Sequence, residues 1–522
     1  MKVPVLLPKA FSFPLTYESG NFKSLKVGDV VIVPFGKKKE FGVIWDKIQL
    51  TKKKIKIRNI EDKVQNFSIK KSVIDYINWF SSYNLASKGM VLKMCLGNKD
   101  NLSKIENNKK NQFLEANNHS SLNKEQEKSL SDLRKFGKKF NVSLLQGVTG
   151  SGKTHVYFER VKEVLKKKQQ VLILLPEIFL TNQFKKRFED FFGFSPSIWH
   201  SKISLKTKRQ IWQGVISNKL NLVIGARSSL LLPFKNLGLI VLDEEHDPSY
   251  KQDEGLIYHA RDMAIARASF EKIPIHLVSA VPSLETFKNI LDKKYNHTKL
   301  FNRFNKSSFP KAKVINLNET KLKKDGFIAE EAADIAKDYL ERGDQVLFFL
   351  NRRGYSPFLI CKSCGYKHLC KNCSIFLTYH KLIKKLVCHH CGYKTEAKRK
   401  CTVNKKDLCD FRMYGPGVEK IFDELRIIFP EKNIKIFSSD FMSKKKEIDI
   451  TIKKIEKNEI NILIGTQLIS KGFNFPKLNC IIVVDADFSG MGYDLRTTEK
   501  NIQLYNQLSG RAGRFSKDST VH

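Results

Sequence analysis

One continuous stretch of the chain has the residue types and spacing that bind phosphate. It reads GVTGSGKT, residues 147–154, and stands between an apolar run and a helical pattern. It matches G-x-x-x-x-G-K-[ST], in which glycines let backbone N–H groups face phosphate oxygens at the positive end of the following helix. We expect Lys153 to reach the β and γ phosphates of a nucleoside triphosphate and Thr154 to ligate Mg²⁺. The other residues of the expected cradle are Gly147, Val148, Thr149, Gly150, Ser151 and Gly152.

Two adjacent carboxylates extend the same chemistry. The apolar run LGLIVL ends in DEEH, residues 243–246, and the carboxyl end of a strand is where an α/β sheet places ligand chemistry. We predict that Asp243 holds Mg²⁺ through its water shell and that Glu244 orients and deprotonates the attacking water. The alternative is an acidic turn after a core strand. Together with the phosphate-binding stretch, the carboxylates indicate hydrolysis of a nucleoside triphosphate.

Two arginines lie far along the chain, in QLSGRAGR, residues 507–514. Arg511 and Arg514 are three positions apart, which predicts that they share one helical face. Arginines of this kind can stabilise the charge on a transferring phosphoryl group from across a domain interface. A cleft that closes on the nucleotide and reopens on product release would make the protein a motor. The alternative is a solvated turn.

The cysteines indicate a different chemistry. Eight of the ten lie between residues 361 and 409, mostly as C-x-x-C pairs. In an intracellular chain this spacing favours metal over disulfides. Four thiolates complete a tetrahedral Zn²⁺ site and leave no position for a catalytic water, so such sites are structural. Cys95 and Cys480 lie in apolar runs and are interpreted as core residues.

Length and charge restrict the kind of partner. A chain of 522 residues is expected to form three or four domains. Its formal net charge of +40 favours a polyanion such as nucleic acid. Part of this excess can instead reflect a composition rich in lysine. No run of about 18 apolar residues occurs, so we expect a soluble, cytoplasmic protein without a membrane segment.

The elements that hold these residues follow from the periodicity of the chain. Short β-like runs and a helical pattern predict a small N-terminal module, and a polar stretch after it is interpreted as a linker. Apolar strands then alternate with helical stretches, which is typical of parallel sheets in α/β domains. The predicted parts are the N-terminal module (1–98), the linker (99–120), a first lobe (121–300), a second lobe (301–360 plus 415–522) and a cysteine-rich insertion (361–414).

These stretches together resemble superfamily 2 helicases and, among them, the primosomal replication-restart (PriA) family. VPFGKKKEFGVI is similar to part of that family's N-terminal domain that binds three-prime DNA ends. LNKEQEKSL is similar to its adenine-reading segment, with Gln126 at the matching position, and ILIGTQLISKGFNFP to motif V. The resemblance implies an α/β fold of two RecA-like parallel-sheet helicase lobes, an inserted double zinc-binding module and a small N-terminal β-rich DNA-binding domain.

The resemblance also implies an activity. It implies an ATP-dependent three-prime to five-prime DNA helicase that acts at stalled or abandoned replication forks, restarts replication and assists primosome assembly. The expected cofactors are ATP, Mg²⁺ and Zn²⁺. The expected partners are single-stranded and forked DNA, other primosome proteins and single-strand-binding protein, and the expected state is a monomer. Two other interpretations stay open: another superfamily 2 nucleic-acid translocase, and a non-enzymatic zinc-bearing DNA scaffold.

The family has two nested structural zinc sites, and the resemblance assigns their ligands. The inner set would be Cys370, Cys373, Cys388 and Cys391, and the outer set Cys361, Cys364, Cys401 and a fourth ligand. The position expected to supply that fourth ligand holds Asn404, and asparagine is a poor zinc ligand. We predict that Cys409 takes its place; otherwise the outer zinc is weak or absent. His389 and His390 are alternative ligands.

Other positions depart from the family pattern. Val281, in SAVPS, replaces a hydroxyl residue that helps to couple hydrolysis to DNA movement. Phe11 keeps an aromatic that would stack on a terminal base, whereas Ser12 replaces an acidic residue, which weakens the case for end-specific recognition. The alternative for Phe11 is a core aromatic.

The stretch SYKQDEGLIYHARD, residues 249–262, mixes aromatic and basic residues close to DEEH. We predict that Tyr250 and Tyr258 stack on unpaired bases while Lys251 and Arg261 contact phosphate, so that the loop reports DNA to the ATP site. The alternative is an ordinary loop with buried tyrosines.

The chain stops eight residues after Arg514, whereas the family continues through another strand and a C-terminal domain. We therefore expect a fragment or a shortened form with a C-terminally truncated second lobe. A sheet without its final strand would expose an edge. Weak or poorly coupled activity is expected as a result.

Overall fold

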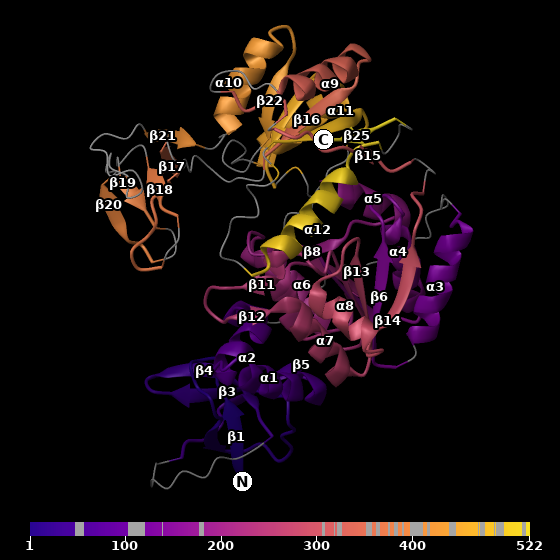
Figure 1. Cartoon of the computed structure of the whole chain (residues 1–522). Helices are drawn as coiled ribbons and strands as arrows, with labels where there is room; N and C mark the ends of the chain where they lie inside the picture. The colour runs from indigo at the N-terminus through magenta and orange to yellow at the C-terminus, as the bar shows by residue number, and fades with distance from the viewer. Residues whose placement is uncertain are drawn as a thin grey trace. The chain divides into compact units, whose positions relative to one another are not determined.

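The structure is a computed structural model of the chain, and its described part forms two compact units, Met1–Phe304 and Asn305–His522. Figure 1 shows the elements of each unit, which are treated separately below. The described residues are 1–46, 57–102, 121–137, 139–176, 182–304, 308–317, 319–320, 326–350, 358–361, 366–373, 376–380, 385–388, 391–396, 411–414, 418–437, 445–467, 469, 475–484, 486, 495–513 and 518–522.

A five-stranded antiparallel sheet opens the first unit, in the order β2-β1-β4-β3-β5. Residues alternate between its two faces, as the period of a strand requires. Val31 and Val33 pack into a small core under the sheet, whereas Val30 packs on the other face, toward the rest of the unit. The elements are β1 Lys2–Leu6, β2 Leu15–Glu18, β3 Asp29–Phe35, β4 Lys38–Ile44, β5 Asp62–Ser68, α1 Lys71–Tyr83, α2 Lys88–Leu96 and the 3-10 helix η1 Lys99–Leu102.

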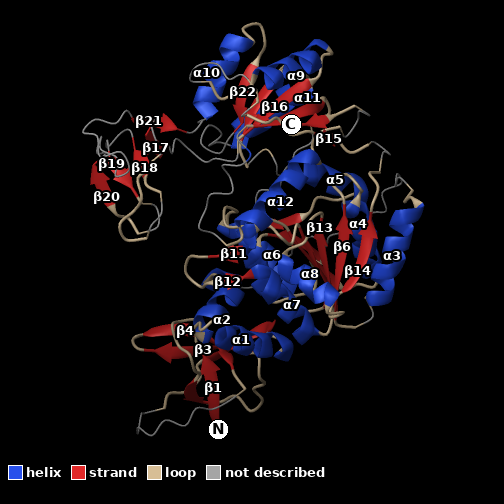
Figure 2. Cartoon of the chain, in the orientation of Figure 1, coloured by secondary structure: helices blue, strands red, loops and turns tan. Residues whose placement is uncertain are grey.

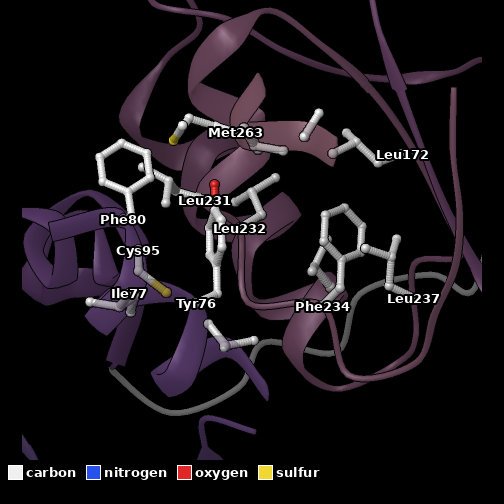
Figure 3. Packing of buried hydrophobic residues seen from close by; sticks show 14 of the residues in the cluster. Tyr76, Ile77, Phe80, Cys95, Leu172, Leu231, Leu232, Phe234, Leu237 and Met263 are labelled. Atoms are coloured by element: carbon white, nitrogen blue, oxygen red, sulfur yellow. The ribbon is translucent and has the colours of Figure 1, made fainter. Parts of the chain in front are cut away.

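The N-terminal sheet and helices share a hydrophobic core with the lobe that follows. Figure 3 shows Tyr76, Phe80 and Cys95 of the N-terminal helices packed beside residues of that lobe such as Phe234. Trp212 Nε1 donates to the backbone carbonyl of Cys95 at 2.8 Å. Cys95 is fully buried, as predicted, and burial raises the pKa of its thiol to about 12. The predicted N-terminal module is thus joined to the first lobe by continuous packing.

A buried ion pair lies at the same junction. Arg267, on the helix α7 (Ala260–Glu271), has 0% of its surface exposed. Its guanidinium lies 5.7 Å from the ring centroid of Tyr76 and 5.9 Å from that of Phe234. Its Nη2 is 3.5 Å from one carboxylate oxygen of Glu271, and Ser72 of α1 donates to the other oxygen at 3.1 Å. Because a buried charge is costly without such partners, polar contacts as well as apolar packing define this junction.

The predicted linker begins inside this packed region. Asn101 and Leu102 of η1 are buried, and Gln213 Nε2 donates to the Asn101 carbonyl at 3.2 Å. Because the stretch is polar overall, its sequence did not predict that these two residues are buried. Residues 103–120 lie outside the described part of the chain.

A seven-stranded parallel sheet forms the centre of the first unit, in the order β14-β6-β13-β10-β7-β9-β8. Strand β7 shows why the sheet was recognisable: Leu172 and Leu174 pack into one core and Val171 and Ile173 into another, so the strand is apolar on both faces after Gln170. Helices accompany the sheet, as Figure 2 shows. The further elements are α3 Lys124–Phe136, β6 Asn141–Gly147, α4 Lys153–Lys166, β7 Gln170–Leu174, α5 Asn182–Phe192, β8 Ser197–Trp199, α6 Leu205–Ile216, β9 Leu222–Gly225, η3 Arg227–Leu231, β10 Leu237–Asp243, η4 Pro248–Tyr250, β11 Lys251–Gln252, β12 Tyr258–His259, β13 Pro274–Ser279, α8 Leu284–Leu291 and β14 Asn296–Leu300.

The second unit holds a six-stranded parallel sheet, in the order β15-β25-β24-β16-β23-β22. The prediction of two parallel-sheet lobes is therefore confirmed. Cys480 is fully buried in β24, as predicted, and burial raises the pKa of its thiol to about 12. The elements are β15 Lys311–Ala312, α9 Glu330–Glu341, β16 Gln345–Phe349, α10 Val418–Ile428, β22 Ile434–Phe437, α11 Lys445–Glu456, β23 Ile462–Gly465, β24 Leu478–Val483, α12 Thr497–Ser509 and β25 Thr520–Val521.

A short strand follows α12 in this sheet. Strand β25, Thr520–Val521, pairs in parallel with β24 on one side and with β15 on the other. It pairs with Cys480 and Ile481 of β24, and the expected truncation of the second lobe stays a prediction. A two-residue strand is too short to give a periodic signal, which is why the sequence pattern missed it.

The described residues of the cysteine-rich insertion form two small antiparallel sheets, β17-β21 and β18-β19-β20. Its hydrophobic clusters are small, so its folding depends on something besides apolar burial. The strands are β17 Phe358–Cys361, β18 Thr378–His380, β19 Lys385–Val387, β20 Lys394–Glu396 and β21 Phe411–Tyr414.

The search for membrane spans gives a negative result for the described residues: none of their helices has both the length and the apolar character to cross a bilayer.

Candidate nucleotide site and cysteine cluster

The phosphate-binding stretch lies between a strand and a helix, as its sequence context predicts. Strand β6 ends at Gly147 and α4 begins at Lys153. Gly150 and Gly152 have φ of +86° and +80°, a left-handed backbone that glycine adopts without steric cost. A Cβ on Gly147 would lie 2.8 Å from Lys153 Cγ, so this position also needs glycine. A loop of this shape at a helix N-terminus favours an anion.

Lys153 and Ser151 are arranged to meet phosphate oxygens. Lys153 Nζ donates to the backbone carbonyls of Gly147 at 2.6 Å and Val148 at 3.3 Å. The Ser151 hydroxyl is buried and has no hydrogen-bond partner among the described atoms. Phosphate oxygens would give both groups charge-assisted partners, so these residues fit a nucleotide. Thr154 follows in the first turn of α4.

Asp243 lies at the carboxyl end of β10, beside the neighbouring strand β13. Tyr157 of α4 donates to its Oδ2 at 3.0 Å, and the backbone N–H of Glu244 donates to its Oδ1 at 2.9 Å. The pKa of Asp243 is raised to about 7, first by burial and then by the Glu244 carboxylate, against the lowering effect of Lys153. Lys153 is therefore close enough to act on this carboxylate.

Glu244 adopts an uncommon backbone conformation. Its φ is +49°, in the left-handed region that residues with a Cβ rarely occupy. Its Oε2 is buried, accepts no hydrogen bond from the described residues, and lies 3.7 Å from His246 Nε2. A carboxylate oxygen in this state is a candidate acceptor for a water proton.

Serines on both sides of Val281 connect DEEH to SAVPS. His246 Nδ1 and Ser279 Oγ are 2.8 Å apart. The backbone N–H and the hydroxyl of Ser283 donate to the Glu245 carboxylate at 2.7 Å and 3.0 Å. These contacts between the two stretches do not pass through Val281.

Gln126 ties α3 to the phosphate loop. It is fully buried in a capping box, in which its N–H donates to Asn123 Oδ1 at 2.9 Å and its Oε1 accepts from Asn123 N at 3.1 Å. Its Nε2 donates to the carbonyl of Ser151 at 2.9 Å. One N–H and one lone pair of its amide remain, the pair of groups that can read an adenine edge. Because Gln126 has no exposed surface here, its role in reading adenine stays a prediction.

Sequence reasoning missed a segment, residues 301–304, that contacts the phosphate loop. The N–H of Phe304 donates to the carbonyl of Gly150 at 2.9 Å. Arg303 is 3% exposed, its Cγ lies 3.7 Å from the place of a Cβ on Gly150, and burial lowers its pKa. The first compact unit includes this segment and extends to Phe304. The only signal in the sequence is one arginine among many basic residues.

Of the two arginines predicted to share one helical face, only Arg511 lies in the described part of the chain. Helix α12 ends at Ser509, and Arg511 lies in a turn after it. Gly510 is the C-cap of the helix and keeps right-handed dihedrals, whereas Gly513, with φ of +64°, is left-handed. Arg511 is 7% exposed, and Arg514 lies outside the described residues. The role of both arginines at the phosphoryl group stays a prediction.

The prediction that Tyr250 and Tyr258 stack on unpaired bases is wrong. They are 0% and 3% exposed, as the alternative of buried tyrosines requires. The Tyr250 hydroxyl lies 2.6 Å from the carbonyl oxygen of Asp243, so the tyrosine supports the end of β10. Arg261 is also buried and cannot contact phosphate, whereas Lys251 is exposed.

Phe11 is half-buried and meets Phe35 edge to face, with ring centroids 5.7 Å apart. It packs against the core of the N-terminal sheet, as the alternative interpretation predicts. Part of its ring stays accessible beside the exposed Ser12. Stacking of Phe11 on a terminal base stays a prediction.

Four cysteines lie together as the predicted inner zinc set requires. The Sγ atoms of Cys370, Cys373, Cys388 and Cys391 are all within 4.8 Å of one another. Cys373 Sγ is 3.6 Å from those of Cys370 and Cys388, and the Cys370 and Cys391 sulfurs are 3.5 Å apart. Thiolates about 2.3 Å from a tetrahedral Zn²⁺ are about 3.8 Å apart, so the donor set fits zinc.

Only one residue of the predicted outer zinc set is described. Cys361 is buried in β17, where its N–H donates to the carbonyl of Tyr366 at 2.9 Å. Completion of this site by Cys409 stays a prediction. Outside the described part of the chain lie Cys364, His389, His390, Cys401, Asn404 and Cys409.

Comparison with known families divides the chain in a similar way. Residues 3–97 match the 3'DNA-binding domain (3'BD) of PriA. Residues 123–290 match the DEAD/DEAH box helicase family, and residues 382–516 match the helicase conserved C-terminal domain. The first match covers the N-terminal sheet and its helices, and the second covers the phosphate loop and DEEH.

Similar proteins align over most of the chain. The replication restart protein PriA of Rickettsia felis is 42% identical over 521 residues, which are 99% of this chain and 79% of that protein. PriA of Haemophilus influenzae is 37% identical over 79% of this chain and 56% of its own length. PriA of Bacillus subtilis is 35% identical over 73% of this chain and 47% of its own length. The chain therefore belongs to the PriA family of replication restart helicases.

Proposed function

We propose that this ATP-dependent DNA helicase moves three-prime to five-prime along single-stranded DNA at stalled or abandoned forks. Family membership and the two helicase domains make it a helicase that acts in replication restart. The direction of movement and the preference for forks are proposed. The observation that supports hydrolysis best is the grouping of Lys153 and the half-buried Asp243, which interact electrostatically at the ends of neighbouring elements.

Each residue of the nucleotide site has a proposed role. Backbone N–H groups of residues 147–152 bind the phosphates, and Lys153 neutralises the β and γ phosphates. Thr154 and Asp243 would hold Mg²⁺, which supplies positive charge for the developing phosphate charge. Glu244 accepts a proton from the attacking water. In the same assignment, Gln126 would bind the adenine. Arg511 and Arg514 would stabilise the charge on the transferring phosphoryl group.

The binding partners follow from the domains. The match to the 3'DNA-binding domain supports binding to DNA, and we propose that the protein binds single-stranded and forked DNA. The inner cysteine set would hold a structural Zn²⁺, and Cys361, Cys364, Cys401 and Cys409 a second one. Other primosome proteins and single-strand-binding protein are proposed protein partners of a cytoplasmic monomer.

ATP turnover by the full chain tests this function. Forked DNA is expected to raise turnover more than blunt duplex or RNA does. Lys153→Ala should abolish turnover, whereas Lys166→Ala, which removes the same charge from the exposed end of α4, should retain it. Equally negligible turnover by the wild type and Lys153→Ala would favour a non-enzymatic scaffold. Equal stimulation by RNA or blunt duplex would favour another superfamily 2 translocase.

A further inference from the structure

The third acidic residue of DEEH, Glu245, has no role in the hydrolysis described above, yet it is 0% exposed. Its Oε1 accepts the backbone N–H of Ser283 at 2.7 Å. Its Oε2 accepts the hydroxyls of Ser283 and Thr286, each at 3.0 Å, and lies 3.3 Å from Arg261 Nη1. Arg261 Nη1 also donates to Ser283 Oγ at 2.5 Å. Both carboxylate oxygens are therefore held by donors.

These donors come from different elements. Ser283 is the N-cap of α8, and Arg261 lies in the first turn of α7. Glu245 itself follows the end of β10. A buried carboxylate is costly unless it is paired and fully hydrogen-bonded, so removal of even one donor should destabilise the folded arrangement around Glu245. The network thus fixes the end of β10 against the starts of two helices.

The same network fixes the residue before it. The backbone N–H of Glu245 donates to the carbonyl of Val278 in β13 at 3.1 Å. On the other side, the N–H of Glu244 is held by Asp243 Oδ1 at 2.9 Å. Between these two anchors Glu244 has φ of +49°. A strained conformation of this kind persists only where the surroundings enforce it.

We propose that Glu245 is a positioning residue for ATP hydrolysis. Its buried hydrogen bonds to Ser283, Thr286 and Arg261 hold Glu244 in the left-handed conformation, and thereby hold the Glu244 carboxylate where it orients the attacking water. Glu245 does not touch the nucleotide in this role. The inference rests on the proposed function, because it requires Glu244 to act on water.

Glu245→Gln tests the inference with little change in side-chain volume, because it replaces one acceptor by an amide that faces donors. We expect kcat for DNA-stimulated ATP hydrolysis to fall about 10- to 100-fold, the loss typical of a misplaced catalytic group. The KM for ATP and the Kd for ADP should change less than about threefold, because the phosphate loop is untouched. Ser283→Ala removes one donor and should lower kcat in the same direction by a smaller factor.

Glu285→Gln is the matched control. Glu285 lies 3.7 Å from the same Arg261 nitrogen but is not bonded to Glu245, so its variant should keep kcat within about threefold of the wild type. A purely structural role for Glu245 would lower the stability of the first unit and leave kcat unchanged. A raised KM with unchanged kcat would mean that Glu245 acts on nucleotide binding. Either result overturns the inference.

Glu244→Gln separates the two levels of the assignment. If it leaves hydrolysis intact, the proposed role of Glu244 fails and the inference fails with it. If it abolishes hydrolysis while Glu245→Gln and Ser283→Ala keep the wild-type kcat, only the inference about Glu245 fails. Should Glu245→Gln not fold, Ser283→Ala alone decides, and a wild-type kcat there overturns the inference.

Discussion

His276 makes the stability of the ATP-binding lobe sensitive to acid. It is 0% exposed on β13, the strand between β6 and β10. Its Nδ1 is 2.6 Å from Ser143 Oγ, whereas its Nε2 has no hydrogen-bond partner among the described residues. Burial, and to a lesser degree Arg160, lowers the pKa of His276 from 6.5 to about 3. The folded lobe therefore holds this imidazole neutral.

The sign of the effect follows from proton binding. Between the two pKa values of His276 the unfolded chain binds the proton and the folded chain does not, so its contribution is complete above about 6.5 and is lost as the pH falls. From pH 7 to pH 5 this one group should cost about 2 kcal/mol of the free energy of unfolding. Asp243 has the opposite effect, because its pKa of about 7 lies above the ordinary 3.8. Only the difference between wild type and a His276 variant isolates the histidine.

Urea unfolding of the full chain, followed by tryptophan fluorescence, measures this difference. All four tryptophans, Trp45, Trp79, Trp199 and Trp212, lie in the first unit and report its unfolding. His276→Asn keeps a polar group near Ser143 but cannot be protonated.

Between pH 7 and pH 5 the wild type should lose about 2 kcal/mol more than His276→Asn. His297→Asn, on β14 at the edge of the same sheet, is the control. That histidine is only half-buried: burial lowers its pKa, but its ring is not isolated from water. Parallel loss of stability in the wild type and His276→Asn would refute the reasoning from burial.

The same fluorescence and a zinc assay check two other features. Arg267→Met leaves Glu271 buried without its cation and should lower the free energy of unfolding of the first unit by about 3–5 kcal/mol. Lys128→Met, on the exposed side of α3, should lower it little. Equal effects of the two substitutions would contradict the importance of the buried pair. Cys388→Ser should lower the zinc bound per chain by one equivalent. Cys95→Ser, in the apolar core, should leave the bound zinc unchanged. Unchanged zinc content in Cys388→Ser would exclude Cys388 as a ligand.

The parts that the sequence predicts well are those in which chemistry and periodicity are local. Apart from Gln170 at the start of β7 and Asp243 at the end of β10, these two strands hold no polar side chain, and a strand covered on both faces has this pattern. The phosphate loop is specified by its own glycines. The C-x-x-C spacing indicates metal, whereas the grouping of the four inner cysteines into one site came from the family resemblance.

The parts that the sequence does not predict depend on distant residues. Tyr250 and Tyr258 are aromatic residues in short irregular segments, and only the packing of the lobe decides that they are buried. Arg303 is recognisable as a residue of the phosphate site only once the structure places its side chain against Gly150. The spacing of the arginines suggested a helical path through Arg511, whereas α12 ends at Ser509 and Arg511 lies in a turn after it.

The order of strands in the second sheet has a consequence for how the protein is made. Strand β15 joins that sheet through β25 alone, since Lys311 pairs with Thr520 and Ala312 with Val521. During synthesis, residues 311–312 leave the ribosome long before their partners exist, and the edge of β24 that pairs with β25 also stays unpaired, for a shorter interval, until Thr520 and Val521 are made. Contacts this distant in sequence form slowly, and an unpaired rim invites wrong pairing. Nascent chains of this protein are therefore expected to need protection by chaperones until residue 521 has emerged.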